Sequence, residues 1–223
     1  MTPGVAGADP VVDLGSTLDA AAGALGMALS PLQSRQLLQF LALLERWNRT
    51  YNLTAIRALP AMLTHHVVDC LAAAAALRRR LGEAQALRVL DVGSGGGLPG
   101  VVLAIALPGR RVTCVDRVGK KAAFVRQVAG SLGLANLESL HARVEDLASR
   151  RYDVVTARAF ASLSDLVAAT RELLAPGGSW MALKGKSPDA ELAELPEDVV
   201  FHVEPLHVPG LDAERCLVWL KGR

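Results

Sequence analysis

The stretch that decides the fold lies at residues 89–100 and reads Val89-Leu90-Asp91-Val92-Gly93-Ser94-Gly95-Gly96-Gly97-Leu98-Pro99-Gly100. Its first four residues are typical of a buried strand, and the glycines after them predict a sharp turn. Pro99 suits the first turn of a helix. Glycines let the backbone approach a ligand closely, and in open α/β sheets ligands bind beyond the carboxyl ends of strands. The stretch therefore predicts a strand, a ligand-binding loop and a helix.

The chain after this loop alternates between strand-like and helix-like patterns. Strands are predicted near residues 111–115, 137–140, 153–157, 179–183, 199–207 and 215–220. Helices are predicted near residues 99–106, 119–132 and 162–174. Strands alternating with crossover helices indicate a parallel sheet, whereas the last two strands are separated only by residues 208–212. We expect an α/β fold with a mostly parallel seven-stranded sheet that ends in an antiparallel hairpin.

The chain before the loop predicts a helical cap. Residues 1–26 are rich in Gly, Ala and Asp, and we expect a loose N-terminal arm there. A helix is expected to begin at Ser30 as N-cap with Pro31 at its first position, and to end near Trp47. Residues 51–54 then predict a turn or a short extended piece, and a second helix is expected from Pro60 to about Arg80. The expected division is an arm at 1–26, a cap at 27–82 and a sheet domain at 83–223.

Composition excludes several classes of protein. The 223 residues include 24 basic and 22 acidic side chains, for a net charge of +2, so a uniformly cationic nucleic-acid binder is excluded. Three scattered cysteines predict neither a disulfide framework nor a metal site. Apolar runs are shorter than a membrane span, and the first 34 residues lack the basic start of a secretory signal. We expect a soluble, cytoplasmic protein with no metal and no membrane partner.

Positive charge is concentrated in the middle of the chain. Residues 35–158 hold 18 basic and 9 acidic side chains, and the two flanks are acidic. A charge cluster is often only a solvated face. A ligand-binding loop inside the cluster favours RNA as a partner, because attraction to phosphates supplies most sequence-independent affinity.

The loop discriminates between cofactors. A dinucleotide fingerprint needs a glycine where Leu98 stands, and the Lys-Ser/Thr ending of a P-loop is missing. The remaining pattern, Asp-x-Gly-x-Gly-x-Gly, resembles the first motif of the Rossmann-like class I methyltransferases, which use S-adenosylmethionine. Asp116 ends the next predicted strand, where a carboxylate can accept hydrogen bonds from both hydroxyls of a ribose. A glycine-rich turn alone can be purely structural, but this context favours cofactor binding.

Further segments resemble one family. Tyr51-Asn52-Leu53-Thr54, His66-Val67-Val68-Asp69, Gly97-Leu98-Pro99-Gly100, Arg158-Ala159-Phe160-Ala161 and Leu183-Lys184-Gly185 occur in this order. From about Arg35 to Lys221 the chain is similar to the RsmG (GidB) family of bacterial methyltransferases. The resemblance implies methyl transfer to N7 of a guanine in 16S ribosomal RNA, either naked or within the small ribosomal subunit, by an enzyme that we expect to be a monomer.

The resemblance and the motif together assign the candidate site residues. Cofactor contacts are expected at Asp91, Gly93, Gly95, Gly97, Leu98, Asp116, Val144, Glu145 and Arg158. Candidates for RNA binding are Asn52, Arg117, Lys120, Lys121, Lys184 and Lys186. For Arg158, Lys184 and Lys186 a merely solvated position remains the alternative, and Asn52 could equally cap a turn. His65 and His66 lack partners at metal-ligand spacing, so a histidine satisfied by the cap is the preferred interpretation.

The expected chemistry needs no certain catalytic side chain. Guanine N7 carries an in-plane lone pair and no proton, so a general base is unnecessary and orientation dominates. Arg158 is the candidate to act beside the loop. Two alternatives remain: a class I methyltransferase for a small molecule or protein, and a non-catalytic RNA-binding assembly factor. A dehydrogenase is a more distant possibility.

Overall fold

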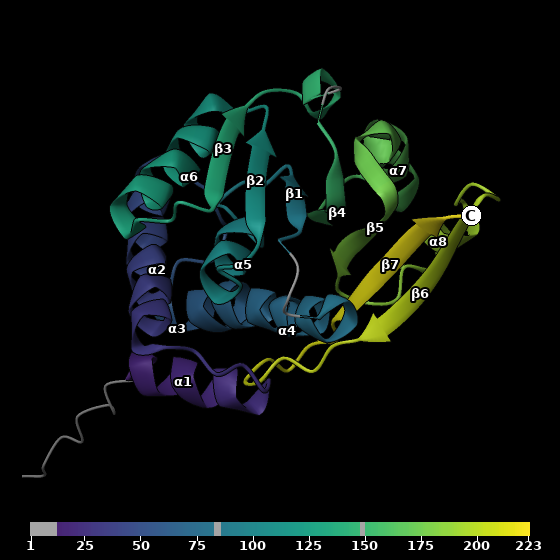
Figure 1. The fold of residues 1–223 in the computed structure, drawn as a ribbon. Helices are drawn as coiled ribbons and strands as arrows, with labels where there is room; N and C mark the ends of the chain where they lie inside the picture. Colours follow the sequence, from purple (N-terminus) through teal and green to yellow (C-terminus); the bar gives the residue numbers. More distant parts are fainter. Residues whose placement is uncertain (1–12, 83–85, 148–149) are drawn as a thin grey trace, which may run out of the picture.

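The computed structural model describes residues 13–82, 86–147 and 150–223, which build an α/β structure around one seven-stranded sheet (Figure 1). The strand order is β3-β2-β1-β4-β5-β7-β6. The strands are β1 (Arg88–Val92), β2 (Arg111–Asp116), β3 (Leu137–His141), β4 (Tyr152–Arg158), β5 (Leu174–Lys184), β6 (Val199–Pro205) and β7 (Cys216–Gly222). Strands β1 to β5 pair in parallel, and β7 is antiparallel to β5 and β6. The predicted sheet with its C-terminal hairpin is confirmed.

Helices cover the two faces of the sheet unequally. The α-helices are α1 (Leu14–Ala24), α2 (Pro31–Tyr51), α3 (Leu59–Met62), α4 (Asp69–Leu81), α5 (Gly100–Ala106), α6 (Gly119–Leu132), α7 (Leu163–Thr170) and α8 (Asp189–Ala193). A π-helical segment, Leu63–Val68, joins α3 to α4. Side chains from α1, α2, α4, α5 and α6 share one hydrophobic core with one face of the sheet. The other face packs mainly against α7.

The second face is open over β2 and β3. Between β3 and β4 the described chain forms only a short 3₁₀ turn, Val144–Leu147, where a crossover helix would otherwise lie. Consequently Glu138, which points to this face from β3, is exposed. Alternate residues of a strand point to opposite faces, so Thr113 and Glu138 lie on the open side while Val112 and Leu137 enter the larger core.

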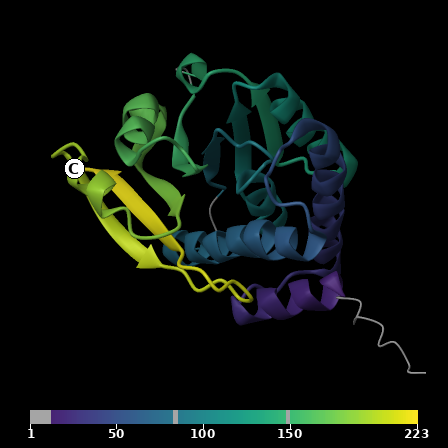
Figure 2. The same cartoon turned by 180° about the vertical axis from the view of Figure 1, so that it is seen from behind.

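The predicted loose arm is wrong over residues 14–24, which form α1. Asp13 caps this helix by accepting a hydrogen bond from the Gly15 amide. Leu18, Ala21 and Ala22 lie at helical spacing and are buried, so small residues that look featureless in sequence form an apolar stripe. Figures 1 and 2 both place the loop between β6 and β7 beside α1, and Pro209 lines a shallow pocket with it. The rest of the predicted arm, residues 1–12, lies outside the described residues.

Other boundaries shift by a few residues. The first long helix begins at Pro31 with the expected Ser30 cap and continues through Tyr51, which the sequence places in a turn. Asn52 then ends the helix in a left-handed conformation. The helix predicted at 162–174 ends at Thr170, and β5 begins at Leu174. The helix at 119–132 is confirmed with the expected bounds.

One continuous helical stretch, Leu59–Leu81, is long and apolar enough to span a membrane, so the expectation that all apolar stretches are too short is corrected. Its most apolar window is 72% buried inside the protein. The buried alanines 72–76 let α4 approach α5 closely, which explains the apolar composition by core packing.

Candidate functional site

A cavity of about 410 Å³ opens at the carboxyl ends of the parallel strands. Its lining comes from the ends of β1, β2 and β4 and from the segment after β3: Val92, Gly93, Val115, Asp116, Arg117, Ala142, Arg143, Val144, Glu145, Ala159, Phe160 and Ala161. Apolar side chains form its walls, and one buried carboxylate, Asp116, is among the lining groups. Such a mixture suits a ligand with a flat apolar part and a few hydrogen-bonding groups.

The glycine loop forms one rim of this cavity. Gly93 has a φ of +65°, and a Cβ built on it would meet nothing within 4 Å. A side chain at this position would therefore point into open space beside the cavity. Gly97 has a φ of +78°, and a Cβ there would come within 2.5 Å of Val101 Cγ2. Gly93 thus leaves room for a ligand, and Gly97 lets the loop pack on α5.

Asp116 connects β2 to the glycine loop. Its Oδ2 accepts a hydrogen bond from the Gly95 amide at 2.9 Å, and its Oδ1 accepts one from the Val118 amide at 2.8 Å. The carboxylate is 6% exposed and lines the cavity. Each carboxylate oxygen can accept a second hydrogen bond, so this group can still bind a diol. The position agrees with the expected contact to ribose hydroxyls.

Asp91 lies beneath the loop and does not line the cavity. It is fully buried, and its Oδ2 accepts a hydrogen bond from the Gly100 amide at 2.8 Å. Its Oδ1 has no hydrogen-bond partner within the described part of the chain. Burial raises the pKa of Asp91 to about 7. The sequence places Asp91 among the cofactor contacts, whereas the structure has it supporting the start of α5.

The remaining predicted cofactor residues divide into two groups. Val144 and Glu145 line the cavity from the 3₁₀ turn after β3. Gly95, Gly97 and Leu98 belong to the loop but lie behind its rim rather than on the cavity wall. Leu98 is 4% exposed, and its amide donates to the Ser94 carbonyl.

Arg158 does not line this cavity, and a cofactor contact through it stays a prediction. Alternation along β4 turns its side chain toward the cap, on the same side as Thr156. Its Nη1 lies 3.6 Å from Asp69 Oδ2, 3.2 Å from the His65 carbonyl oxygen and 3.3 Å from His66 Nδ1. Arg158 therefore joins β4 to the helical cap.

Asp69 is the centre of this buried cluster. The side chain is 6% exposed, and Arg215 donates from Nε to Oδ1 at 3.1 Å. Burial raises the pKa of Asp69, and the charges of Arg158 and Arg215 oppose that shift. Two arginines from β4 and the segment before β7 thus share one carboxylate of α4.

His66 extends the cluster toward the turn after α2. Its Nε2 lies 2.7 Å from Thr54 Oγ1, and its Nδ1 lies 3.0 Å from the His65 carbonyl oxygen. Burial, and then the charge of Arg158, lowers the pKa of His66 to about 4. The histidine is therefore neutral near pH 7. The interpretation of His66 as satisfied by the cap agrees with these contacts, and no group of three potential metal ligands occurs in residues 13–82, 86–147 and 150–223.

The predicted RNA-binding residues are scattered. Arg117 is exposed and lines the cavity, and Lys120 and Lys121 follow it at the start of α6. Asn52 is exposed and accepts a hydrogen bond from Arg57 at 3.1 Å. Lys186 is exposed after β5.

Lys184 differs from the expectation of a phosphate contact. Its Nζ lies 2.7 Å from Glu191 Oε2, and its side chain is 16% exposed. The glutamate of α8 therefore already satisfies this lysine.

Seven cavity residues were not among the predicted site residues: Val92, Val115, Ala142, Arg143, Ala159, Phe160 and Ala161. Phe160 lies in the Arg158-Ala159-Phe160-Ala161 motif, so a signal for it was present. Ala142 and Arg143 lie in no motif, and only the end of β3 brings them to the cavity. The three cysteines are free and buried.

Comparisons with known proteins agree with one another. The family model GidB, rRNA small subunit methyltransferase G, matches residues 33–218. The chain is 57% identical over 208 residues to "Ribosomal RNA small subunit methyltransferase G" of Methylibium petroleiphilum, covering 93% of this chain and 94% of that protein. It is 59% identical over 208 residues to the protein of the same name from Leptothrix cholodnii, covering 93% and 95%.

Solved structures at low identity share the fold. A methyltransferase described as SAM dependent, from Aquifex aeolicus, has a TM-score of 0.54 at 14% identity, covering 72% of this chain and 93% of that one. Aeropyrum pernix fibrillarin, solved with bound S-adenosyl-L-methionine, has a TM-score of 0.53 at 16% identity, covering 67% and 73%. The class I methyltransferase fold is confirmed.

Proposed function

The chain belongs to the GidB family, rRNA small subunit methyltransferase G, and we propose that it transfers the methyl group of S-adenosylmethionine to N7 of a guanine in 16S rRNA. The observation that carries this proposal is the cavity at the glycine loop. It combines an open approach at Gly93 with a buried carboxylate at Asp116. The family match includes helix α2 of the cap as well as the sheet, so it extends beyond the part that all class I methyltransferases share.

The residues around the cavity fit S-adenosylmethionine. Asp116 would hold the ribose hydroxyls, and Val144 with Glu145 would lie beside the adenine. Gly93 would let the loop backbone approach the amino-acid part of the cofactor. We propose that four residues act indirectly, by holding the loop in the conformation that binds the cofactor: Asp91, Gly95, Gly97 and Leu98.

The mechanism requires positioning rather than proton transfer. When bound, S-adenosylmethionine supplies a methyl group on a positively charged sulfur. The chain's residues must align guanine N7 with that group and exclude water, and orientation of this kind can supply about 7–11 kcal/mol of the barrier. No residue has to remove a proton, because N7 carries none. Phe160 lines the cavity and offers a flat apolar surface on which a base could stack.

Arg158 is proposed as a positioning residue. Its contacts with Asp69, His65 and His66 hold the end of β4 against the cap. The next residues, Ala159 to Ala161, line the cavity, and Ala159 adopts a positive φ of 65°. The anchored arginine thus supports a strained turn that shapes the cavity.

The reaction is tested by incubating the protein with labelled S-adenosylmethionine and, separately, 30S subunits, naked 16S rRNA or a pool of small metabolites. Label in rRNA at a guanine that becomes sensitive to N7-specific cleavage supports the proposal. Label only in metabolites would favour the small-molecule alternative. Absence of label despite cofactor binding would favour an assembly factor. We further propose that the active form is a cytoplasmic monomer, to be checked by sedimentation.

A further inference from the structure

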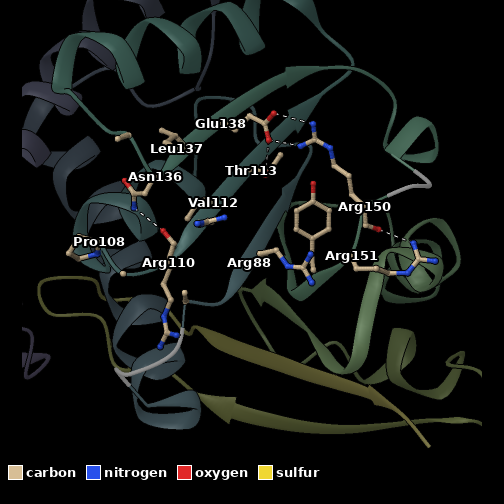
Figure 3. A pocket seen from close by; sticks show the side chains of 15 residues that line it. Arg88, Pro108, Arg110, Val112, Thr113, Asn136, Leu137, Glu138, Arg150 and Arg151 are labelled. Carbon is tan, nitrogen blue, oxygen red and sulfur yellow. Dashed lines mark hydrogen bonds and ion pairs between the residues drawn. The ribbon is translucent and has the colours of Figure 1, made fainter.

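A second and larger cavity lies at the opposite edge of the sheet, where the parallel strands begin. Its volume is about 930 Å³. The lining comes from the starts of β1 to β4 and the loops before them: Ala86, Arg88, Pro108, Gly109, Arg110, Arg111, Val112, Thr113, Ala135, Asn136, Leu137, Glu138, Arg150, Arg151 and Tyr152. Figure 3 shows Arg110 and Pro108 across the cavity from Arg150 and Arg151. The open face over β2 and β3 leaves room for this hollow.

The cavity is strongly basic. Five arginines line it, and Glu138 is the single acidic residue among the lining groups of the described chain. These arginines are far apart in sequence and come together only because the starts of neighbouring parallel strands meet at one edge. The family's motifs and the cofactor cavity use none of them.

Neighbouring acids neutralise only part of this charge. Glu138 binds Arg150 through two contacts, of 2.5 and 3.2 Å. Asp153 Oδ2 lies 3.8 Å from the Nε of Arg88, whose side chain is 49% exposed. Arg111 is exposed and forms no ion pair with any described residue. Arg88 and Arg111 therefore keep exposed positive charge that a ligand can approach.

The neutral polar groups of the lining are engaged within the protein. The Tyr152 hydroxyl is buried beside the guanidinium of Arg150. Asn136 also lines the cavity, but its Nδ2 already donates to the Ala104 and Arg110 carbonyls, both at 3.0 Å. The groups open to a ligand are therefore the planar cations of Arg88 and Arg111, and guanidinium groups match the geometry of phosphate oxygens.

We propose that this cavity binds backbone phosphates of the RNA substrate, away from the methylated base; this inference rests on the proposed function. Arg88 and Gly93 lie at opposite ends of β1, so the two cavities are separated by about 16 Å at ~3.3 Å per residue. RNA must pass around the sheet, so at ~3.4 Å per stacked nucleotide an RNA that reaches both cavities must extend at least about five nucleotides from the target guanine. The cavity at the amino edge thus favours long RNA over short RNA, while the cavity at the carboxyl edge binds one base.

The test compares two double variants that each remove two positive charges. Arg88→Gln/Arg111→Gln alters the cavity. The control, Lys221→Gln/Arg223→Gln, alters the C-terminal end of β7, where both residues are exposed. RNA affinity is measured across a salt series, with a 16S rRNA fragment of about 30 nucleotides and with a pentanucleotide centred on the target guanine. Melting temperatures establish that both variants are folded.

We expect the cavity variant to bind the long fragment about tenfold more weakly than the control, with a salt dependence reduced by one to two phosphate contacts. The pentanucleotide should bind both variants equally. In methylation assays KM for the long RNA should rise while kcat is unchanged. Equal affinity of the two variants for the long fragment would overturn the proposal.

A competition arm separates two sources of phosphate. Inorganic triphosphate is added to the wild-type protein and to the cavity variant. If the variant loses affinity for triphosphate but keeps its affinity for long RNA, the cavity takes a small phosphorylated ligand and the RNA assignment is wrong. The proposed function can fail independently: a wild-type protein that methylates no RNA, but whose RNA affinity still depends on Arg88 and Arg111, would overturn the reaction and leave this inference standing.

Discussion

The two edges of the sheet use arginine in different ways. At the carboxyl edge, Arg158 and Arg215 share the buried carboxylate of Asp69. At the amino edge, Arg88 and Arg111 are exposed and at most weakly paired. A buried pair is costly to break because it leaves an uncompensated charge, whereas exposed charges are screened by salt and remain available to a partner. Burial therefore gives Arg158 and Arg215 a structural role, and exposure makes Arg88 and Arg111 suited to binding.

The largest expected effect is on cofactor binding at the carboxyl edge. The substitution Gly93→Val places a branched side chain in the open space beside the cavity and strains a positive φ. We expect affinity for S-adenosylmethionine to fall by about 100-fold, measured by calorimetry, because a blocked site cannot relax around the side chain.

A matched control for this experiment is Gly133→Val. Gly133 has the same φ of +65° and open space around its Cβ position, but it lies at the end of α6. Backbone strain should be similar in the two variants, and cofactor affinity should be retained in the control. Equal loss of affinity in both variants would show that strain, and not obstruction, explains the result.

The next largest expected effect is on stability, where the loss of a buried arginine is compared with the loss of an exposed one. Arg158→Met removes one cation from the Asp69 cluster, and we expect the free energy of unfolding to fall by about 3 kcal/mol. Arg171→Met breaks the exposed pair with Asp198 (2.6 Å) and should cost less than about 1 kcal/mol. Urea unfolding of both variants measures the difference. If the two substitutions cost the same, Arg158 does not hold the cap on the sheet.

The dependence of stability on pH tests the buried groups at the carboxyl edge. Because the pKa of His66 is lowered to about 4, the folded state keeps this histidine neutral while the unfolded state binds a proton below about pH 6.5. Its contribution is therefore present above pH 6.5 and is lost as pH falls toward 4. Burial raises the pKa of Asp91 to about 7, which acts in the opposite direction over much of this range. The wild type alone would conceal both effects.

The variant His66→Gln isolates the histidine. The stability difference between wild type and variant should grow by about 2–3 kcal/mol as pH rises from 4 to 6.5, and then stay constant. Denaturant unfolding at several pH values measures it. A difference that is constant across this range, or that shrinks with rising pH, would contradict a buried neutral histidine.

The smallest expected effect is on stability at the amino edge. Arg111→Gln removes an exposed charge that forms no ion pair with a described residue, so the free energy of unfolding should change by less than about 0.5 kcal/mol. Thermal unfolding at low and high salt checks this. A loss of more than 1 kcal/mol would mean that Arg111 supports the fold, and the contrast between the edges would disappear.

Much of the architecture follows from local patterns. The helix at 119–132, the strand ends at Val92 and Asp116 and the hairpin after β5 were all predictable, because alternation and glycine turns depend on neighbouring residues. Helix α1 was not, since its small residues are buried only once α2 and the π-helical segment pack against them. Arg158 was placed at the correct edge of the sheet, but its contacts with Asp69 and the cap were not predictable, because one residue along a strand decides which face a side chain points to.

The sequence by itself determined the methyltransferase fold, the glycine loop and the place of Asp116, since each depends on residues that are close together in the chain. The tertiary structure alone decided which charges are buried and which are open. It placed Asp69 between Arg158 and Arg215, and it gathered Arg88, Arg111 and Arg150 at one hollow. These charged residues lie on strands that are far apart in sequence. Which of them pair and which stay exposed is therefore decided only when the sheet has formed.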